Sequence, residues 1–376
     1  MTEAVTDAAL DAVTDAEPAA RRRGPLADLL GGPRVDIGDA ELLVLVVCNL
    51  VSTVGLAGDI ARHLQTPDDL QGDFLSSWHL VLYGGVTAVG VWLGVGAIRH
   101  GPRFVASAGW TTAGFLMLAV GGMADAAWHA AFGTEANVEA LVSPPHLLVF
   151  AGLGLLLTSP IVILWRRPER RLGVVPSLVA LSSMVTFLLV TSLFTGFLSP
   201  LASGMSLSQG YVEPMVGESP VDYDQVRGLG IAAWTSALLV AALVVLLVRF
   251  RPTRGLVGLS IFLCGAPVLA LSDPQVVQPL VIGYAAAGIV AEVLLAVLGR
   301  PTLGRVGAAV TGAAMSAALW SAMFAALAAD GRLQWSEAMW GGTILLSAMV
   351  GATVGALVAL PIPGPGDELV DGSRAT

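Results

Sequence analysis

Charge is scarce in this chain of 376 residues: 12% of its residues are Asp, Glu, Lys or Arg, whereas 55% are hydrophobic. The mean hydropathy is +0.77, and a soluble domain could not hide so much apolar surface in one core. The composition therefore excludes an ordinary soluble domain and indicates an integral membrane protein. The formal net charge is −9, so nothing in it favours binding to nucleic acid.

Cysteine is rare, and the familiar catalytic motifs are missing. The two cysteines, Cys48 and Cys264, both fall inside apolar runs, where a free cysteine usually serves as a small hydrophobic side chain. We therefore expect neither a disulfide nor a thiolate ligand. The sequence has no GxSxG, Walker, dinucleotide-binding or HExxH pattern, so hydrolase, nucleotide-binding and metalloprotease functions lack support.

Ten long apolar runs dominate the sequence, and each has roughly the 20 residues that a helix needs to cross hydrocarbon. They cover residues 41–62, 78–98, 104–128, 146–165, 174–198, 228–248, 255–272, 279–299, 306–329 and 339–361. Continuous apolar runs favour helices, which satisfy their own backbone hydrogen bonds in lipid. The predicted fold class is an all-α, polytopic membrane bundle of about ten transmembrane helices.

Every basic residue is arginine, and most arginines fall in alternate loops. By the positive-inside rule those loops face the cytoplasm, as do both termini, in a multi-pass protein of the cell membrane. The opposite, extracytoplasmic loops carry mainly acidic residues. We expect a disordered cytoplasmic tail (1–38), a duplicated metal-binding unit (39–171), the remaining membrane bundle (172–362) and a second cytoplasmic tail (363–376).

Four of the five histidines belong to a pattern that occurs twice, at residues 59–79 and 125–146. The copies lie 66 positions apart, with one residue inserted before the last histidine. The matched residues are Asp59 and Asp125, His63 and His129, Asp69 and Glu135, Asp73 and Glu139, and His79 and His146. Weaker matches pair Gly55 with Gly121, Tyr83 with Phe150, and Gly85 with Gly152. The sequence therefore predicts a tandem repeat of two helical hairpins, about 41–98 and about 104–165.

Each copy has the side chains of a metal site. Its aspartate and first histidine are four residues apart, which puts them on one helix face about one turn apart. Its last histidine opens the returning helix, for which Ser143 is the expected N-cap in the second copy. One carboxylate and two imidazoles form a donor set that leaves coordination positions open. The predicted ligands, for one shared metal or for a pair, are Asp59, His63, His79, Asp125, His129 and His146.

Four further acids lie beyond the helix ends: Asp69, Asp73, Glu135 and Glu139. We expect them to hold the imidazoles through hydrogen bonds or to attract cations. Nitrogen and oxygen ligands without sulfur suit copper, zinc, iron or manganese. Histidines at helix ends beside acids are less typical of haem, which favours deeper positions. The competing interpretation is that these polar groups only cap helices and tie them together.

The segment DAAWH, followed by Glu135 and then by SPPH at the head of the next helix, resembles a known metal-binding segment. It is similar to that of the C subunit of the membrane copper monooxygenases that oxidise methane and ammonia. The resemblance implies Asp125, His129 and His146 as copper ligands, and it makes copper the favoured metal ahead of iron or zinc. It covers only residues 125–146, with a second copy at 59–79.

These patterns favour a membrane metalloprotein with an extracytoplasmic His/Asp site, with redox chemistry on a small apolar substrate as the leading hypothesis. A transporter or metal-acquisition protein is an alternative, because transporters often contain internal repeats. A non-catalytic subunit of a larger membrane complex is another, and partner subunits or an oligomer would fit each of the three. Glu292, a lone carboxylate inside an apolar run, is a functional candidate whose role the sequence leaves open.

Overall fold

The computed structural model describes residues 35–65, 76–133, 142–200, 223–265, 274–298 and 304–360. Within those ranges the chain forms helices and no strand, so the predicted all-α class is confirmed. The helices are α3 (Asp39–Gln65), α4 (Ser77–His100), α5 (Arg103–Ser107), α6 (Gly109–Phe132), α8 (Pro144–Trp165), α9 (Val174–Phe194), the 3-10 turn η2 (Gly196–Leu198), α11 (Tyr223–Arg249), α12 (Leu256–Gly265), α14 (Pro274–Val297), α15 (Arg305–Ala329) and α16 (Glu337–Val358). The predicted tails, apart from residues 35–38, lie outside the described residues.

Nine helices in the described ranges are long and apolar enough to cross a membrane, by length and composition. They are α3, α4, α6, α8, α9, α11, α14, α15 and α16, and they match nine of the ten predicted runs. The seventh predicted run, 255–272, begins as the short helix α12. The remainder of that run lies outside the described residues. The prediction of a polytopic helical bundle is therefore confirmed.

The first two helix pairs pack through glycines at matching positions of the repeat. A Cβ on Gly55 of α3 would lie 2.3 Å from the backbone nitrogen of Leu82 in α4. Likewise, a Cβ on Gly121 of α6 would lie 2.9 Å from the side chain of Val149 in α8. In each hairpin a glycine of the returning helix also contacts the outgoing helix. A Cβ on Gly85 of α4 would meet Ser52 of α3, and a Cβ on Gly152 of α8 would meet Leu118 of α6. Because the contacts repeat position by position, the tandem hairpins are a repeat in structure as well as in sequence.

A hydrogen bond made possible by Pro160 of α8 joins the two hairpins. Pro160 lies inside α8 and has no N–H, so the carbonyl of Leu156 loses its usual helical partner. Asn49 of α3 donates to that carbonyl through Nδ2 at 3.1 Å, and Ser159 donates to it through Oγ at 2.7 Å. Since Asn49 is buried, this hydrogen bond ties α3 to α8 within the spanning part of the bundle.

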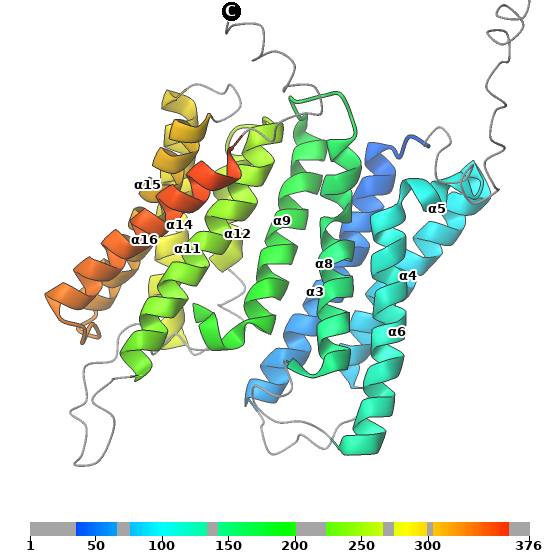
Figure 1. The fold of residues 1–376 in the computed structure, drawn as a ribbon, viewed down its shortest axis with the longest axis horizontal. Coiled ribbons are helices and arrows are strands. Elements are labelled where there is room, and N and C mark those ends of the chain that lie inside the picture. The colour runs from blue at the N-terminus through cyan, green and yellow to red at the C-terminus, as the bar shows by residue number, and fades with distance from the viewer. Residues whose placement is uncertain are drawn as a thin grey trace, which may run out of the picture.

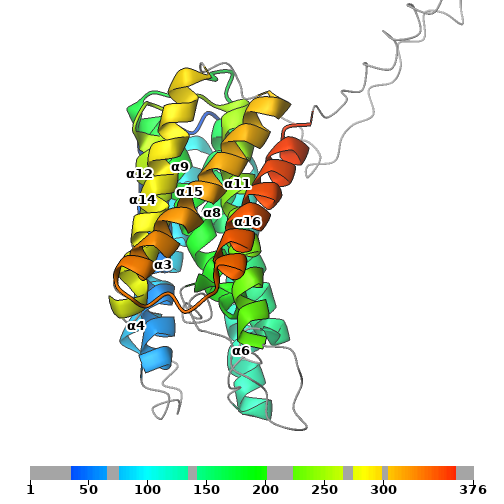
Figure 2. The same cartoon turned by 90° about the vertical axis from the view of Figure 1, so that its left-hand side faces the viewer.

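Helix α9 lies between the hairpins and the remaining helices (Figure 1), against α8 and α3 on one side and α12 and α11 on the other. The last three long helices, α14, α15 and α16, pack in sequence order on the side of the bundle away from the hairpins, which faces the viewer in Figure 2. Here too small residues bring backbones close, because a Cβ on Gly312 of α15 would meet the carbonyl oxygen of Gly351 in α16.

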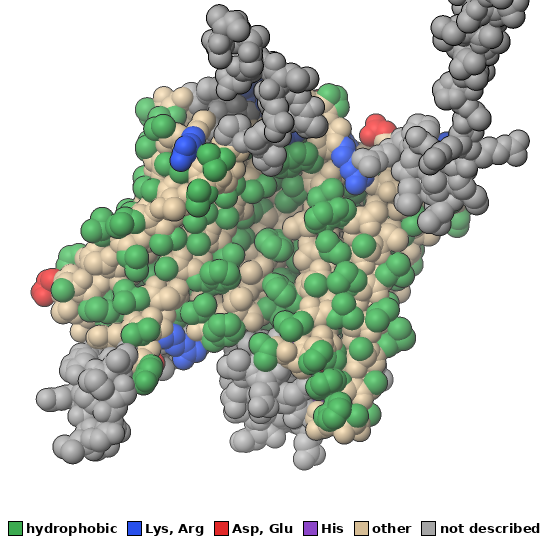
Figure 3. Space-filling view, viewed as in Figure 1, with side chains coloured by type: hydrophobic (Ala, Val, Ile, Leu, Met, Phe, Trp, Pro, Cys, Tyr) green, Lys and Arg blue, Asp and Glu red, His purple; other side chains and the backbone are tan. Residues whose placement is uncertain are grey.

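Charged side chains gather at the two ends of the bundle. On the face drawn in Figure 3, hydrophobic side chains cover the length between those ends, as expected for a surface in lipid. The end that carries α5 (Figure 1) is rich in arginine, and there Arg167 forms an ion pair with Asp39. Asp59 and Asp125, together with the four histidines of the repeat, lie at the opposite end, where α3 and α6 finish and where α4 and α8 begin.

Candidate metal centre

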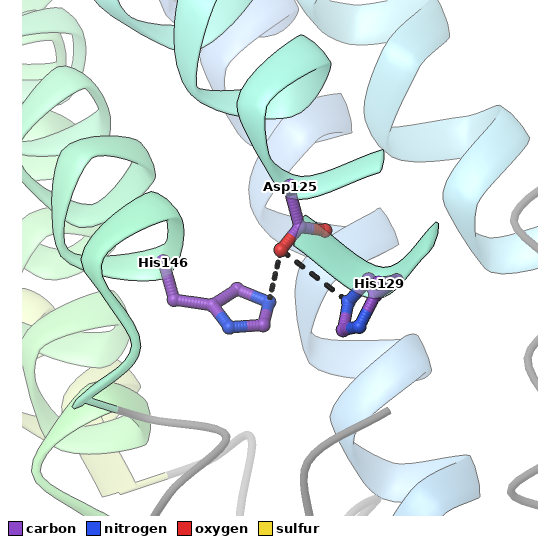
Figure 4. A group of neighbouring side chains, drawn as sticks. All are labelled: Asp125, His129 and His146. Atoms are coloured by element: carbon purple, nitrogen blue, oxygen red, sulfur yellow. Dashed lines mark ion pairs between the residues drawn. The ribbon is translucent and has the colours of Figure 1, made fainter. Parts of the chain in front are cut away.

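The second hairpin brings three predicted ligands together (Figure 4). Asp125 and His129 lie one turn apart on α6, and the Nε2 atom of His129 is 3.3 Å from Asp125 Oδ1. His146 comes from the first turn of α8, and its Nε2 atom lies 3.4 Å from the same oxygen. One oxygen and two nitrogens therefore lie within 4.8 Å of one another. All three side chains are partly buried.

Hydrogen bonds on the far side of each imidazole set its orientation. Nδ1 of His129 lies 3.3 Å from the carbonyl oxygen of Gly133, and a carbonyl can only accept, so Nδ1 carries the hydrogen. Gly133 ends α6 with φ at +83°, a conformation that suits glycine and turns its carbonyl back toward the ring. Nδ1 of His146 lies 2.8 Å from the hydroxyl of Ser143, which can accept its hydrogen in the same way. When Ser143 accepts from Nδ1 of His146, both rings direct an Nε2 lone pair at Asp125.

With both Nε2 lone pairs directed at Asp125, a positive charge is required between the ligand atoms. Asp125 Oδ1 is buried and forms no hydrogen bond within the described part of the chain, although two imidazole nitrogens face it. Lone pairs that face a carboxylate oxygen repel it unless a proton or a metal ion lies between them. Ligands at about 2.0–2.1 Å from a tetrahedral metal are about 3.3 Å apart. The separations of 3.3 and 3.4 Å are those expected for atoms that share one ion.

The first copy repeats part of this geometry. Asp59 Oδ2 lies 3.4 Å from His79 Nε2, the same separation as in the matched pair of the second copy. Ser76, the N-cap of α4, accepts a hydrogen bond from the backbone N–H of His79 and donates to Asp59 Oδ1 at 3.4 Å. His63 lies on α3 one turn beyond Asp59, but its side chain is outside the described set. The first copy therefore shows an aspartate and a histidine together, and its third ligand stays a prediction.

The four acids beyond the helix ends, Asp69, Asp73, Glu135 and Glu139, lie outside the described residues. Their predicted roles are therefore untested. Two residues in the described part were given no role from the sequence. Ser76 is one, and the signal that could have found it is a serine three residues before the last histidine in each copy. Tyr83 is the other: its ring stacks on His79 with centroids 5.6 Å apart.

Comparisons with protein-family models, with curated proteins and with solved structures find no match for this chain. The function is therefore inferred from the geometry of the site.

Glu292, whose role the sequence leaves open, caps the start of another helix. Its Oε1 atom accepts hydrogen bonds from the backbone N–H groups of Val257 and Gly258, both at 3.1 Å. Those groups belong to the first turn of α12, which follows Gly255, a residue with no side chain to serve as a cap. Glu292 therefore supplies from α14 the acceptor that the start of α12 lacks.

Proposed function

We propose that this protein is an integral membrane metalloprotein whose transition-metal site is formed by Asp125, His129 and His146. The observation that carries the proposal is the convergence of one buried carboxylate oxygen and two imidazole Nε2 atoms, with each Nδ1 engaged on the far side. Histidine ligands of metals are typically oriented by such hydrogen bonds on the other ring nitrogen. Nitrogen and oxygen ligands suit copper, iron and zinc alike, and copper is the metal we favour because residues 125–146 resemble the copper-binding segment of the membrane copper monooxygenases.

The proposed activity is redox chemistry, in which a small apolar substrate reaches the site through the bilayer. Three protein ligands leave open positions, where a redox-active metal supplies electron transfer and activation of dioxygen. Inserting one oxygen atom into a C–H bond consumes dioxygen, two electrons and two protons and releases water, so this activity needs an external reductant. Asp125 would contribute negative charge that balances the charge of the metal ion. The two histidines would fix the position of that ion at the edge of the apolar region.

We further propose that the site faces the extracytoplasmic side of the cell membrane and that both termini are cytoplasmic. The arginine-rich end of the bundle then lies in the cytoplasm, as the positive-inside rule requires. In this orientation Asp69, Asp73, Glu135 and Glu139 would lie outside, where they could attract cations to the site. The proposed second ligand set, Asp59, His63 and His79, has the same orientation because the repeat is in tandem.

Metal content of the detergent-purified protein tests the proposal. The wild type, His129→Ala and His146→Ala would be loaded in turn with copper, iron and zinc, desalted and measured by elemental analysis. We expect each variant to lose most of the copper that the wild type retains. His100→Ala is the matched control, because His100 pairs with Glu41 at the opposite end of the bundle. Equal copper in His129→Ala and the wild type would refute the site.

Transport or acquisition of metal is the second candidate function, and the glycine contacts repeated in the two hairpins are the observation that favours it. In that case the site would be the first station for an incoming cation. A flux assay in liposomes separates the candidates: metal-dependent uptake that is lost in His129→Ala supports transport, whereas metal binding without flux supports the redox function. A non-catalytic subunit would bind metal and show neither flux nor oxygen consumption.

A further inference from the structure

Two loops rich in arginine lie side by side at the end of the bundle opposite the metal centre. Residues 166–171 follow α8, and residues 249–254 run from the last residue of α11 toward α12. The backbone N–H of Arg251 donates to the carbonyl of Arg170 at 2.7 Å, and the carbonyl of Arg251 accepts from the N–H of Leu172 at 3.1 Å. These two segments, the paired arginine loops, together contain seven arginines and one acidic residue.

The protein neutralises little of this positive charge. Arg167 forms an ion pair with Asp39. Arg249 donates through Nη2 to the carbonyl oxygens of Trp165 and Arg167 at the end of α8, so its charge meets only uncharged acceptors. Four further arginines form no ion pair within the described ranges: Arg170, Arg171, Arg251 and Arg254. Like charges held close together repel one another, and a bound anion reduces that repulsion.

Arg251 has a donor that the protein leaves unused. Its Nε atom is buried and has no hydrogen-bond partner in the part of the chain that the structure describes. A buried donor without an acceptor is costly, and a guanidinium group matches the oxygens of a phosphate through paired hydrogen bonds. Arg171 is the partner of Arg251 in the backbone bridge, so the two guanidinium groups start from neighbouring positions. An oxyanion between these side chains would satisfy both.

The surroundings of the paired arginine loops are those of a lipid headgroup. Trp165 is partly exposed and packs edge-on against Phe250, with ring centroids 5.4 Å apart. Tryptophan is typical of the level of the headgroups. The helices that begin after the two loops each expose two apolar side chains one turn apart: Val174 and Leu178 on α9, and Leu259 and Leu263 on α12. Acyl chains could therefore continue along apolar surface from a phosphate at the loops.

We infer that the paired arginine loops bind the phosphate group of an anionic phospholipid, whose acyl chains lie along α9 and α12. Basic sites between membrane helices are suited to such lipids, and a zwitterionic lipid lacks the net negative charge that the arginines require. The lipid would reduce the repulsion between the two loops and so strengthen the contact between the end of the second hairpin and the remaining bundle. This site is separate from the proposed metal centre.

Lipid retention by the full chain tests the inference. The protein in a neutral detergent would be mixed with equal amounts of phosphatidylglycerol and phosphatidylcholine, separated from free lipid, and measured by mass spectrometry. We expect the wild type to retain at least tenfold more phosphatidylglycerol. Each arginine near anionic lipid contributes about fivefold in affinity, so the double variant Arg171→Gln/Arg251→Gln should bind phosphatidylglycerol about 25-fold more weakly. The loops should stay paired in this variant, because their bonds are between backbone groups.

A second double variant, Arg103→Gln/Arg305→Gln, is the matched control. It removes the same charge at the first residues of α5 and α15, outside the paired arginine loops, and should bind phosphatidylglycerol within about twofold of the wild type. Equal weakening in the two double variants would show a general effect of charge and overturn the inference. Equal retention of the two lipids by the wild type would also overturn it.

Two measurements on the wild type alone keep the inference testable if a variant does not fold. Sodium chloride should lower the retention of phosphatidylglycerol, because salt screens exposed charges, and retention that ignores salt would contradict a phosphate bound by arginine. Sodium phosphate at the same ionic strength should displace no more lipid than sodium chloride does. Stronger displacement by phosphate would assign the loops to free phosphate and overturn the lipid site.

Discussion

Replacing Glu292 with alanine should destabilise the bundle without affecting the metal site. The substitution removes the acceptor of two backbone N–H groups, Val257 N and Gly258 N, each 3.1 Å from Oε1. A hydrogen bond to a charged group contributes about 1.5–3 kcal/mol, and a lost N-cap usually costs about 1 kcal/mol. Both N–H groups share one oxygen, so we expect a loss of about 2–3 kcal/mol. Glu292→Gln keeps an acceptor and loses the charge, and should cost about half as much.

Reversible unfolding in mixed micelles would measure these changes, and elemental analysis would measure copper in the same preparations. Glu337→Ala provides a matched control, because Glu337 also lies in the first turn of a helix, α16, which Ser336 already caps. We expect the control to stay within about 0.5 kcal/mol of the wild type. If Glu292→Ala were as stable as the wild type while metal flux into liposomes disappeared, the cap would be incidental and Glu292 would belong to a transport pathway.

Three further substitutions test individual contacts. Ser143→Ala should weaken copper binding about tenfold, because His146 loses the hydrogen-bond partner of Nδ1; titration against a competing chelator would detect this, and an unchanged affinity would contradict it. Gly85→Ala should cost about 1–3 kcal/mol in micelle unfolding, since its Cβ would lie 2.5 Å from the Ser52 nitrogen, whereas Gly84→Ala meets nothing within 4 Å and should be neutral. Asn49→Ala should cost about 1 kcal/mol, and less than half of that in a Pro160→Ala background, where residue 160 regains its N–H; equal costs would show that Asn49 does not serve the Leu156 carbonyl.

The fold and the convergence of the ligands could both be predicted from the sequence, because both depend on local sequence patterns. Apolar runs of membrane-crossing length gave the helices, and a spacing of four residues put Asp125 and His129 on one face. The tandem repeat then predicted that each returning histidine meets its aspartate, and His79 and His146 both do so.

Other interactions could not be predicted, since they join residues that no local pattern relates. The carboxylate of Glu292 reaches Val257 across 35 positions, and Asn49 reaches Leu156 across 107. Gly255 and Pro160 indicate in the sequence that a nearby backbone group lacks its usual hydrogen-bond partner. Which helix supplies the replacement partner depends on packing. The two cap serines show the same limit: Ser143 bonds to the imidazole of its copy, whereas Ser76 bonds to the aspartate.

The competing interpretation of the second copy is a structural contact between α6 and α8 without a metal. That contact requires protons between the carboxylate oxygen and the imidazole nitrogens. One carboxylate oxygen faces two imidazoles at 3.3 and 3.4 Å, and without a metal each nitrogen needs its own proton to attract that oxygen. His146 can supply its proton as the neutral Nε2–H tautomer if the Ser143 hydroxyl donates to Nδ1, whereas His129, whose Nδ1 faces a carbonyl, would need a hydrogen on both ring nitrogens. One divalent cation serves all three atoms at once.

The two interpretations therefore differ in how stability responds to metal. A ligand present at 100 times its dissociation constant stabilises the folded state by about 2.7 kcal/mol. If Asp125, His129 and His146 bind metal, copper should stabilise the wild type by about that amount at the corresponding concentration, and Asp125→Asn should abolish most of the gain. If they form only a tie, Asp125→Asn should destabilise the protein equally in chelator and in copper, and the wild type should unfold at the same point in both. Thermal unfolding of the two proteins, with and without copper, therefore decides between an ion-binding site and a structural contact.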